Sequence, residues 1–324
     1  MSGLRLSVPG QGVLLFVAAD AAGARTCTFT IYDNVRADGL QVAWTDSGVA
    51  VRRLSAPEPY PGENTGKGLV ADPRAYFWFS LDAQNGRLRG GVGEARAETA
   101  VYECKLPAVT DAERRESKAF LESLTGFADF NGAAPLRLLR DPVGRPLPLR
   151  VSPSVSLDAI AGGLHLPASH LAPVARQMFD CVAGCQLDTD DFPEFSQAIA
   201  ASIAGGWCRK RLAEKADEFS KTDPNPAETY LRITLGENAG ESPGVPYVLE
   251  IWPAGHFSPT HSHANAEAII KVLHGVIEVQ LYPYLGPRAV PFATADFTAG
   301  DVLWISPTLN QVHRLTNRGT NSLN

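Results

Sequence analysis

The chain has 324 residues, of which 44% are hydrophobic and 20% charged, an ordinary composition for a globular protein. Its formal net charge of −6 provides no basic field that would attract the phosphates of nucleic acid or of anionic lipid. The sequence contains no apolar run approaching the length of a transmembrane helix. We therefore expect neither nucleic acid nor a membrane as a partner.

The length predicts about two domains, and the residue composition predicts their class. The chain contains 29 Gly and 24 Pro, a turn-rich profile that favours many short strands over long helices. We therefore predict a mainly β protein. The five cysteines are scattered and form no Cys-x-x-Cys pair, which favours reduced thiols and a cytoplasmic location.

Residues 1–108 are predicted to form a β-sandwich. Short apolar runs alternate there with Gly, Asp and Asn turns, as in antiparallel sandwiches. The Asn-Gly pair at 85–86 suits the tight turn of a hairpin. The glycines within 90–93 lack a following Lys-Ser/Thr, so we interpret them as strand bulges and not as a phosphate loop.

One part of this sandwich resembles a known module. The segments Tyr76-Phe-Trp-Phe-Ser-Leu, Gly91-Val-Gly-Glu94 and Val101-Tyr102 are similar to the β-sandwich modules called farnesoic acid O-methyltransferase-like domains. The likeness implies no methyl transfer, because no S-adenosylmethionine loop follows. We expect the module to bind a ligand or protein that the sequence does not identify.

Residues 109–154 are predicted to be a linker, because arginines and prolines alternate over 137–150, with one short charged helix from Ala112 to Leu124. Apolar residues at helical spacing then predict amphipathic helices over 155–219. From 228 to 324, apolar alternation between Gly and Pro turns predicts a jelly-roll barrel. The fold predicted is thus an N-terminal β-sandwich, a short helical region and a C-terminal barrel.

Five of the seven histidines lie in the predicted barrel, and three of them have a spacing that suits one shared site. His261 and His263 are two residues apart, so both side chains leave the same face of a strand, and His313 lies on a later segment. A pair with one distant histidine can supply three nitrogen ligands to a metal, and imidazole suits iron, copper, nickel or zinc. We interpret the other histidines as structural, with His256 in a turn beside the site.

Residues 255–317 resemble the two cupin motifs: Gly, five residues, His-x-His, an acidic position and Gly, then Gly, Pro, His, three residues and Asn. Counted back from Gly275, the acidic position falls on Ala268, and strand alternation would turn Glu267 to the opposite face. We therefore expect three histidines and no carboxylate. The alternative is a cupin isomerase or another dioxygenase in which a register slip makes Glu267 a fourth ligand.

Residues 155–324 resemble the cysteine dioxygenase (thiol dioxygenase) family. The likeness rests on the three-histidine pattern and on the segments Tyr230-Leu-Arg232-Ile-Thr-Leu235, Ile251-Trp252, Gly255-His256 and Lys271-Val-Leu-His-Gly275. It implies Fe(2+) on the three histidines, O2 as co-substrate and a small carboxylate-bearing thiol, first of all cysteine, as substrate. It also implies substrate-binding roles for Arg232, Trp252 and His256 and a catalytic role for Tyr230.

Two departures from the family pattern affect the expected activity. Ala268 stands where the animal enzymes have a cysteine that is cross-linked to a tyrosine, so no such bond can form there. The chain ends at Ser322-Leu323-Asn324, where the family continues as Ser-x-His-x-Tyr, which implies a truncated chain or a different surround for the substrate. A further alternative is therefore a non-catalytic or differently metallated cupin with an N-terminal binding module.

Overall fold

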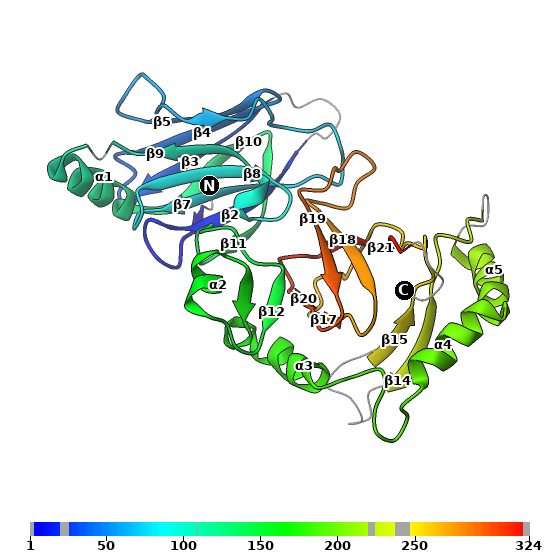
Figure 1. Ribbon diagram of the computed structural model, residues 1–324. Coiled ribbons are helices and arrows are strands. Elements are labelled where there is room, and N and C mark those ends of the chain that lie inside the picture. The colour runs from blue at the N-terminus through cyan, green and yellow to red at the C-terminus, as the bar shows by residue number, and fades with distance from the viewer. Residues whose placement is uncertain (1–2, 20–25, 108, 220–223, 237–246, 320–324) are drawn as a thin grey trace. The chain divides into compact units, whose positions relative to one another are not determined.

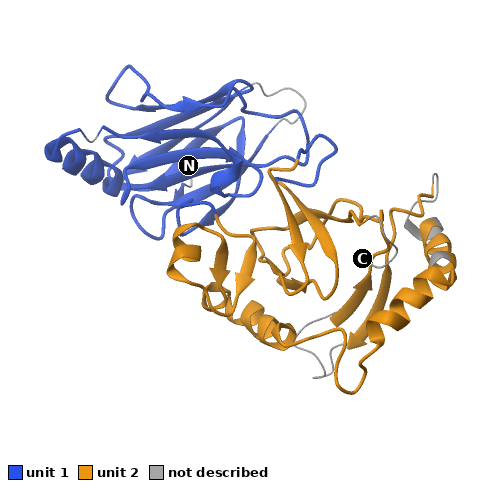
Figure 2. Cartoon of the chain, in the orientation of Figure 1, with its two compact units in different colours: residues 1–146, 283–290 blue, residues 147–282, 291–324 orange. Residues whose placement is uncertain are grey.

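The computed structural model describes residues 3–19, 26–107, 109–219, 224–236 and 247–319, so the expectation about residues 322–324 lies outside the described residues. The protein is mainly β, as predicted (Figure 1). It divides into two compact units (Figure 2). The first contains residues 1–146 and 283–290, and the second contains residues 147–282 and 291–324.

The first unit consists of two mainly antiparallel sheets. One sheet has the spatial order β1 (Leu4–Arg5), β10 (Leu124–Asn131), β3 (Thr26–Asp33), β4 (Gly39–Thr45) and β5 (Gly48–Arg53). The other has the order β11 (Ala133–Leu139), β2 (Gln11–Ala18), β7 (Phe77–Asp82), β8 (Arg87–Val92), β9 (Ala100–Lys105) and β6 (Glu63–Asn64). A short 3-10 helix, η1 (Ala97–Thr99), precedes β9.

Aromatic side chains from both sheets meet in the core of this unit. Phe16 of β2 lies with its ring centroid 5.4 Å from that of Phe29 and 5.6 Å from that of Trp44, both on the opposite sheet. At Gly90 of β8 a Cβ atom would come within 2.7 Å of the Trp44 ring, and the β8–β9 register shifts between Gly90 and Gly91. The predicted bulge is therefore present, and it makes room for a core tryptophan.

The predicted linker is instead largely part of the sandwich. Residues 109–154 contain α1 (Asp111–Ser123), β10, β11 and β12 (Arg150–Ser152). The helix begins with a capping box between Thr110 and Glu113. Pro135 is tolerated in β11 because this strand lies at the edge of its sheet, with a register shift beside the proline.

The second unit contains two four-stranded sheets and a separate strand pair. The first sheet has the order β13 (His165–Pro167), β12, β20 (Val302–Ile305) and β17 (Ala268–Lys271). The second has the order β16 (His261–Ser262), β21 (Val312–Asn317), β18 (Val276–Tyr282) and β19 (Ala293–Thr298). The strand pair is β14 (Leu231–Gly236) and β15 (Tyr247–Ile251).

The two four-stranded sheets share one apolar interior, the two-sheet arrangement expected of a jelly roll. Leu303 of β20 belongs to the same buried cluster as Val279 of β18 and Leu315 of β21. The helices lie before the strand pair in the chain, within the predicted helical stretch: α2 (Leu157–Ala161), η2 (Ala168–His170), α3 (Pro173–Ala183), α4 (Phe195–Ala204) and α5 (Trp207–Phe219).

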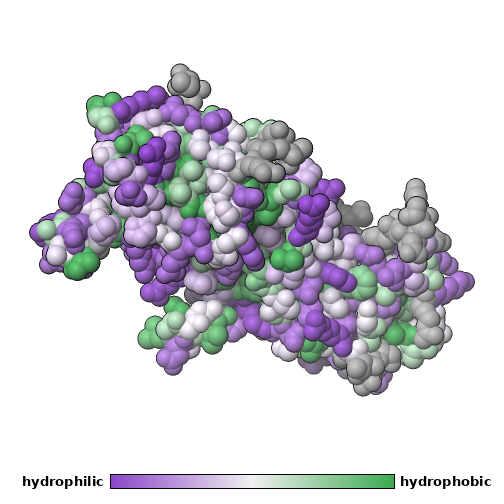
Figure 3. All heavy atoms as spheres, turned by 90° about the horizontal axis from the view of Figure 1, so that it is seen from above, coloured by the Kyte–Doolittle hydropathy of each residue, from purple (hydrophilic) through white to green (hydrophobic). Residues whose placement is uncertain are grey.

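The face drawn in Figure 3 carries mostly hydrophilic side chains, and apolar ones are scattered over it in small groups. No helix in the described part of the chain is both long and apolar enough to cross a membrane.

Candidate metal centre

Strand pairing brings the three predicted histidines together. In the antiparallel pair β16–β21, His261 lies directly opposite His313, and His263 N–H donates to the backbone oxygen of Gln311 at 3.4 Å. Each ring contributes one nitrogen to a group of three that lie within 4.8 Å of one another. The distances between ring centroids are 4.6, 5.0 and 5.3 Å. This cluster has the dimensions of a three-nitrogen metal site.

The hydrogen bonds of the rings leave one nitrogen of each free for a ligand role. The Nδ1 atom of His261 lies 3.0 Å from the backbone oxygen of Pro259, and that of His313 lies 3.3 Å from the backbone oxygen of Asn310. When Nδ1–H donates to a carbonyl, the lone pair is on Nε2. The Nε2 atoms of His263 and His313 are buried and have no hydrogen-bond partner, as expected of nitrogens that face a metal.

Burial favours the neutral form of two of these imidazoles. It lowers the pKa of His313 to about 3, with a further contribution from the neighbouring His261 and His263. Burial and the His261 charge also lower the pKa of His263. Neutral imidazole is the form that binds metals, so the cluster is prepared for a cation at neutral pH.

Two residues that the sequence analysis did not single out hold the histidine segments in place. The side chain of Gln311 donates to the backbone oxygen of Ala266 at 2.9 Å and accepts from the backbone N–H of Asn265 at 3.0 Å. Asn310 is fully buried and donates to the backbone oxygen of Trp304 at 2.8 Å. The Gln311 amide therefore fixes the turn after His263 relative to β21, and the Asn310 amide ties the segment before His313 to β20.

No carboxylate joins the three histidines among the described residues. Ala268 lies in β17 opposite Ile305, and both Ala268 and Glu267 line the cavity beside the cluster. The Oε2 atom of Glu267 is buried without a partner, and burial raises the pKa of this carboxyl. The three histidines thus cluster without an acidic ligand among the described residues. The prediction that Glu267 turns to the opposite face is wrong, because Glu267 precedes β17 and lines the same cavity as Ala268.

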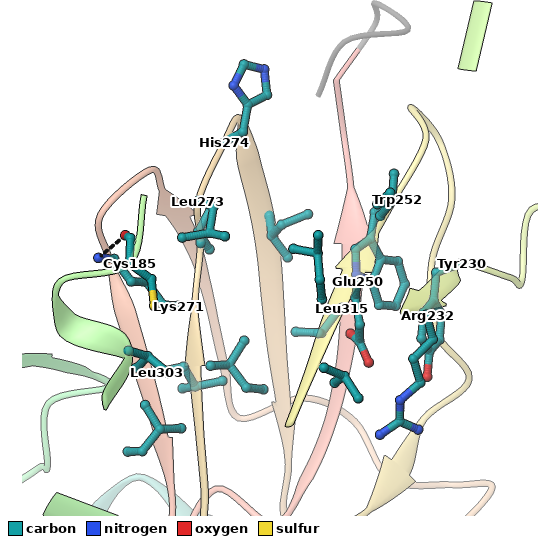
Figure 4. A pocket seen from close by; sticks show the side chains of 18 of the residues that line it. Cys185, Tyr230, Arg232, Glu250, Trp252, Lys271, Leu273, His274, Leu303 and Leu315 are labelled. Carbon is teal, nitrogen blue, oxygen red and sulfur yellow. Dashed lines mark hydrogen bonds between the residues drawn. The ribbon is translucent and has the colours of Figure 1, made fainter. Parts of the chain in front are cut away.

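His261, His263 and His313 line a cavity of about 1020 Å³ within the second unit. Figure 4 shows other side chains that line this cavity. Tyr230, Arg232 and Trp252 line it, as expected of substrate-site residues. The rings of Tyr230 and Trp252 stack with centroids 4.1 Å apart and planes 17° apart. Burial and the charge of Glu250 raise the pKa of Tyr230, so its hydroxyl keeps its proton at neutral pH.

Glu250 is a cavity residue that the sequence analysis missed. It lies opposite Arg232 in the β14–β15 pair, and Figure 4 shows both side chains on the same side of the pair. Burial raises the pKa of Glu250, and this effect is larger than the lowering caused by the charge of Arg232 and by a hydrogen bond from Trp252. The cavity therefore presents an acid beside its arginine, which only the strand register could have predicted.

His256 does not line the cavity that contains the three histidines, unlike the other residues predicted to contact substrate. Its Nδ1 atom lies 2.8 Å from the backbone oxygen of Thr229, and it follows Gly255, whose φ is 80°. The ring thus ties the turn to the segment before β14. The prediction of a turn residue agrees with this position, whereas the prediction of direct substrate contact does not.

The comparisons with known proteins do not change this assignment. No family model and no curated protein matches the chain. The function of the site is therefore inferred from its residues and geometry.

Proposed function

We propose that the protein is a non-haem iron thiol dioxygenase that oxidises a small carboxylate-bearing thiol, first of all cysteine, to its sulfinic acid. The observation that supports this most is the coexistence, in one cavity, of three clustered imidazoles and Arg232. Three nitrogen ligands without a carboxylate leave several coordination positions of a metal open. A cation beside them suits a substrate that carries a carboxylate.

His261, His263 and His313 would hold the iron, and the donor set fits because two buried Nε2 atoms have no other partner. Bound there, Fe(II) would supply the redox chemistry that activates O2 and would favour the thiolate form of the substrate. The reaction is RSH + O2 → RSO2H. Both oxygen atoms pass to sulfur, the sulfur is oxidised, O2 is reduced, and no external reductant is required.

The remaining residues bind and orient the substrate. The guanidinium of Arg232, which is exposed and lines the cavity, would hold the carboxylate through paired charge-assisted hydrogen bonds. Tyr230, with its raised pKa, would act as a hydrogen-bond donor toward the bound thiol. Trp252 is 8% exposed, and its stacked ring excludes water from the wall behind Tyr230.

Metal content and oxygen uptake test this proposal. We expect protein loaded anaerobically with Fe(II) to consume O2 with cysteine and to release cysteine sulfinate, identified by mass spectrometry. Loading with Zn(II) or Ni(II) in place of iron should give no O2 uptake. Bound metal without O2 uptake across cysteine, cysteamine and 3-mercaptopropionate would instead favour the non-catalytic cupin, for which three imidazoles are equally good ligands.

His313→Ala is the matching variant. It removes the most deeply buried of the three ligands, so iron content and O2 uptake should both fall by at least about a hundredfold. His170→Ala, at an exposed position in η2, is the control and should retain both. Unchanged iron content in His313→Ala would rule out the proposed ligand set.

A further inference from the structure

The cavity at the metal centre is much larger than free cysteine requires. Its volume of about 1020 Å³ lies at the upper end of the range of about 300–1,000 Å³ in which proteins bury drug-sized ligands. The histidines and Arg232 occupy only part of its lining. The rest of the wall must therefore be explained by something other than the thiol and carboxylate groups.

Much of that wall comes from two helical stripes. Six large apolar side chains of α3 and α4 line the cavity and recur at intervals of four residues, so each helix turns an apolar line of its surface toward the cavity. These six residues are Val174, Met178, Val182, Phe195, Ile199 and Ile203. Ser196, Gln197 and Ala200 of α4 line the cavity as well, so the helices form a mainly apolar surface next to the polar metal centre.

Core packing accounts for only part of this surface on α3. Ala175 and Phe179 are each 2% exposed and belong to the cluster with Val302 and Trp304, and Met178 of the stripe packs against the same cluster. Val174, by contrast, is 53% exposed. An apolar stripe that a helix does not need for its own packing is typical of a ligand-binding wall.

Besides Arg232 and the histidines, the acidic and basic side chains that line the described cavity are Glu250, Glu267 and Lys271, and Lys271 is already engaged. Lys271 lines the cavity, but its Nζ donates to the backbone oxygens of Ala183 at 2.5 Å and Cys185 at 2.8 Å (Figure 4). Lys271 therefore presents its aliphatic stem to the cavity. A ligand that fills this space needs one polar end, near the histidines and Arg232, and an apolar remainder.

We propose that the natural substrate is a cysteine whose amino nitrogen carries a medium-length apolar acyl chain. This rests on the proposed function, in which the thiol lies at the metal centre and the carboxylate at Arg232. Those two assignments leave the amino nitrogen as the point of attachment. An acyl chain fits better than a peptide, because the six stripe residues offer no side-chain partners for peptide N–H and C=O groups, which are costly to bury unpaired. Ser196 and Gln197, near the start of α4, are the polar residues that the two helices add to the described wall.

Binding to the metal-free protein tests this without relying on catalysis. N-octanoyl-L-serine carries the carboxylate and the chain but has a hydroxyl in place of the thiol. We expect isothermal titration calorimetry to show it binding at least about tenfold more tightly than N-acetyl-L-serine, because burial of apolar chain atoms is favourable. Equal affinity of the two compounds, or no binding by either, would overturn the proposal.

Two substitutions on α4, one in the cavity wall and one outside it, introduce the same negative charge and form a matched pair of variants. Ile199→Glu places a carboxylate in the α4 stripe and should abolish the preference for the octanoyl compound. Ala198→Glu adds the same charge to the same helix at an exposed position that does not line the cavity, so it should keep the preference. If Ile199→Glu does not fold, Met178→Glu tests the α3 stripe in the same way. A preference that survives folded stripe variants would contradict the proposal.

Oxygen uptake then separates the two proposals. With iron-loaded protein we expect kcat/KM for N-octanoyl-cysteine to exceed that for N-acetyl-cysteine by at least about tenfold. If cysteine is oxidised but the octanoyl derivative has no advantage in binding or turnover, the substrate inference fails and the dioxygenase stands. If the octanoyl serine binds as expected and no thiol is oxidised, the apolar site stands and the dioxygenase fails.

Discussion

At the scale of single residues, two of the three imidazoles, those of His263 and His313, stand out because their buried Nε2 atoms have no hydrogen-bond partner among the described residues. His165, for comparison, has its Nδ1 atom 2.8 Å from the hydroxyl of Ser152. His313 is completely buried, has its Nδ1 at Asn310, and still leaves Nε2 without a partner. An unpaired buried nitrogen costs free energy in the metal-free protein, and metal coordination would remove that cost.

Arg232 gives the clearest residue-scale prediction. Arg232→Ala should raise KM for cysteine by about 10- to 100-fold, because a charge-assisted hydrogen-bonded pair contributes about 1.5–3 kcal/mol. KM for cysteamine, which has no carboxylate, should change much less. Steady-state O2 uptake with both thiols measures the difference. Equal effects on the two thiols would remove the carboxylate-binding role of Arg232.

The sequence indicated some of these residues and not others, for a physical reason. His261 and His263 could be recognised because their two-residue spacing carries its own geometry on a strand. Glu250 could not be recognised, because its place beside Arg232 depends on the pairing of β14 with β15. Gln311 acts through contacts with residues some 45 positions earlier in the chain, and a single sequence contains no signal for such contacts.

At the scale of elements, the metal centre depends on a short turn joined to a strand. Ala264 and Asn265 have φ values of 51° and 66°, a left-handed conformation that is unfavourable for alanine. The Gln311 side chain bonds to the backbone of Asn265 itself and of Ala266, the residue after the pair. We infer that Gln311 stabilises the turn and so positions His263 relative to His313.

Gln311→Ala should therefore weaken the metal site without removing a ligand. We expect metal affinity to fall by about 10-fold or more, the range found when groups that orient ligands are lost, and the free energy of unfolding to fall by about 1–3 kcal/mol. Competition with a chelator and chemical denaturation measure the two effects. Gln280→Ala, on the neighbouring strand β18 and outside the cavity lining, is the control. Identical metal affinity in the two variants would contradict the role of Gln311.

Secondary structure was predicted correctly where local sequence signals determine it, and incorrectly where it depends on a strand's position in the assembled sheet. The charged helix expected from Ala112 to Leu124 is present as α1, Asp111–Ser123, because its cap and periodicity are local signals. The stretch after it was predicted to be a linker because of its prolines and arginines. It includes β11 because an edge strand accepts a proline at a register shift, and edge position is a property of the assembled sheet.

At the scale of the whole molecule, the chain does not complete one unit before it begins the other. Residues 283–290 follow β18 and precede β19, two strands of the second unit, yet they belong to the first. Tyr284 is 4% exposed and is part of the first unit's core cluster. The sequence analysis placed the whole of 228–324 in the barrel, because nothing in a run of turn residues indicates which core a single tyrosine joins.

This arrangement predicts that a substitution within the barrel sequence destabilises the sandwich. Tyr284→Ala should cost the first unit about 3 kcal/mol, as expected when a large aromatic side chain is removed from a core. Hydrogen exchange followed by mass spectrometry should then show faster exchange in β3 and β4 than in the wild type, with β18 and β21 little changed. Val290→Ala, in the same segment but 67% exposed, should leave all four strands unaffected. Faster exchange confined to β18 and β21 would show instead that the tyrosine stabilises the second unit.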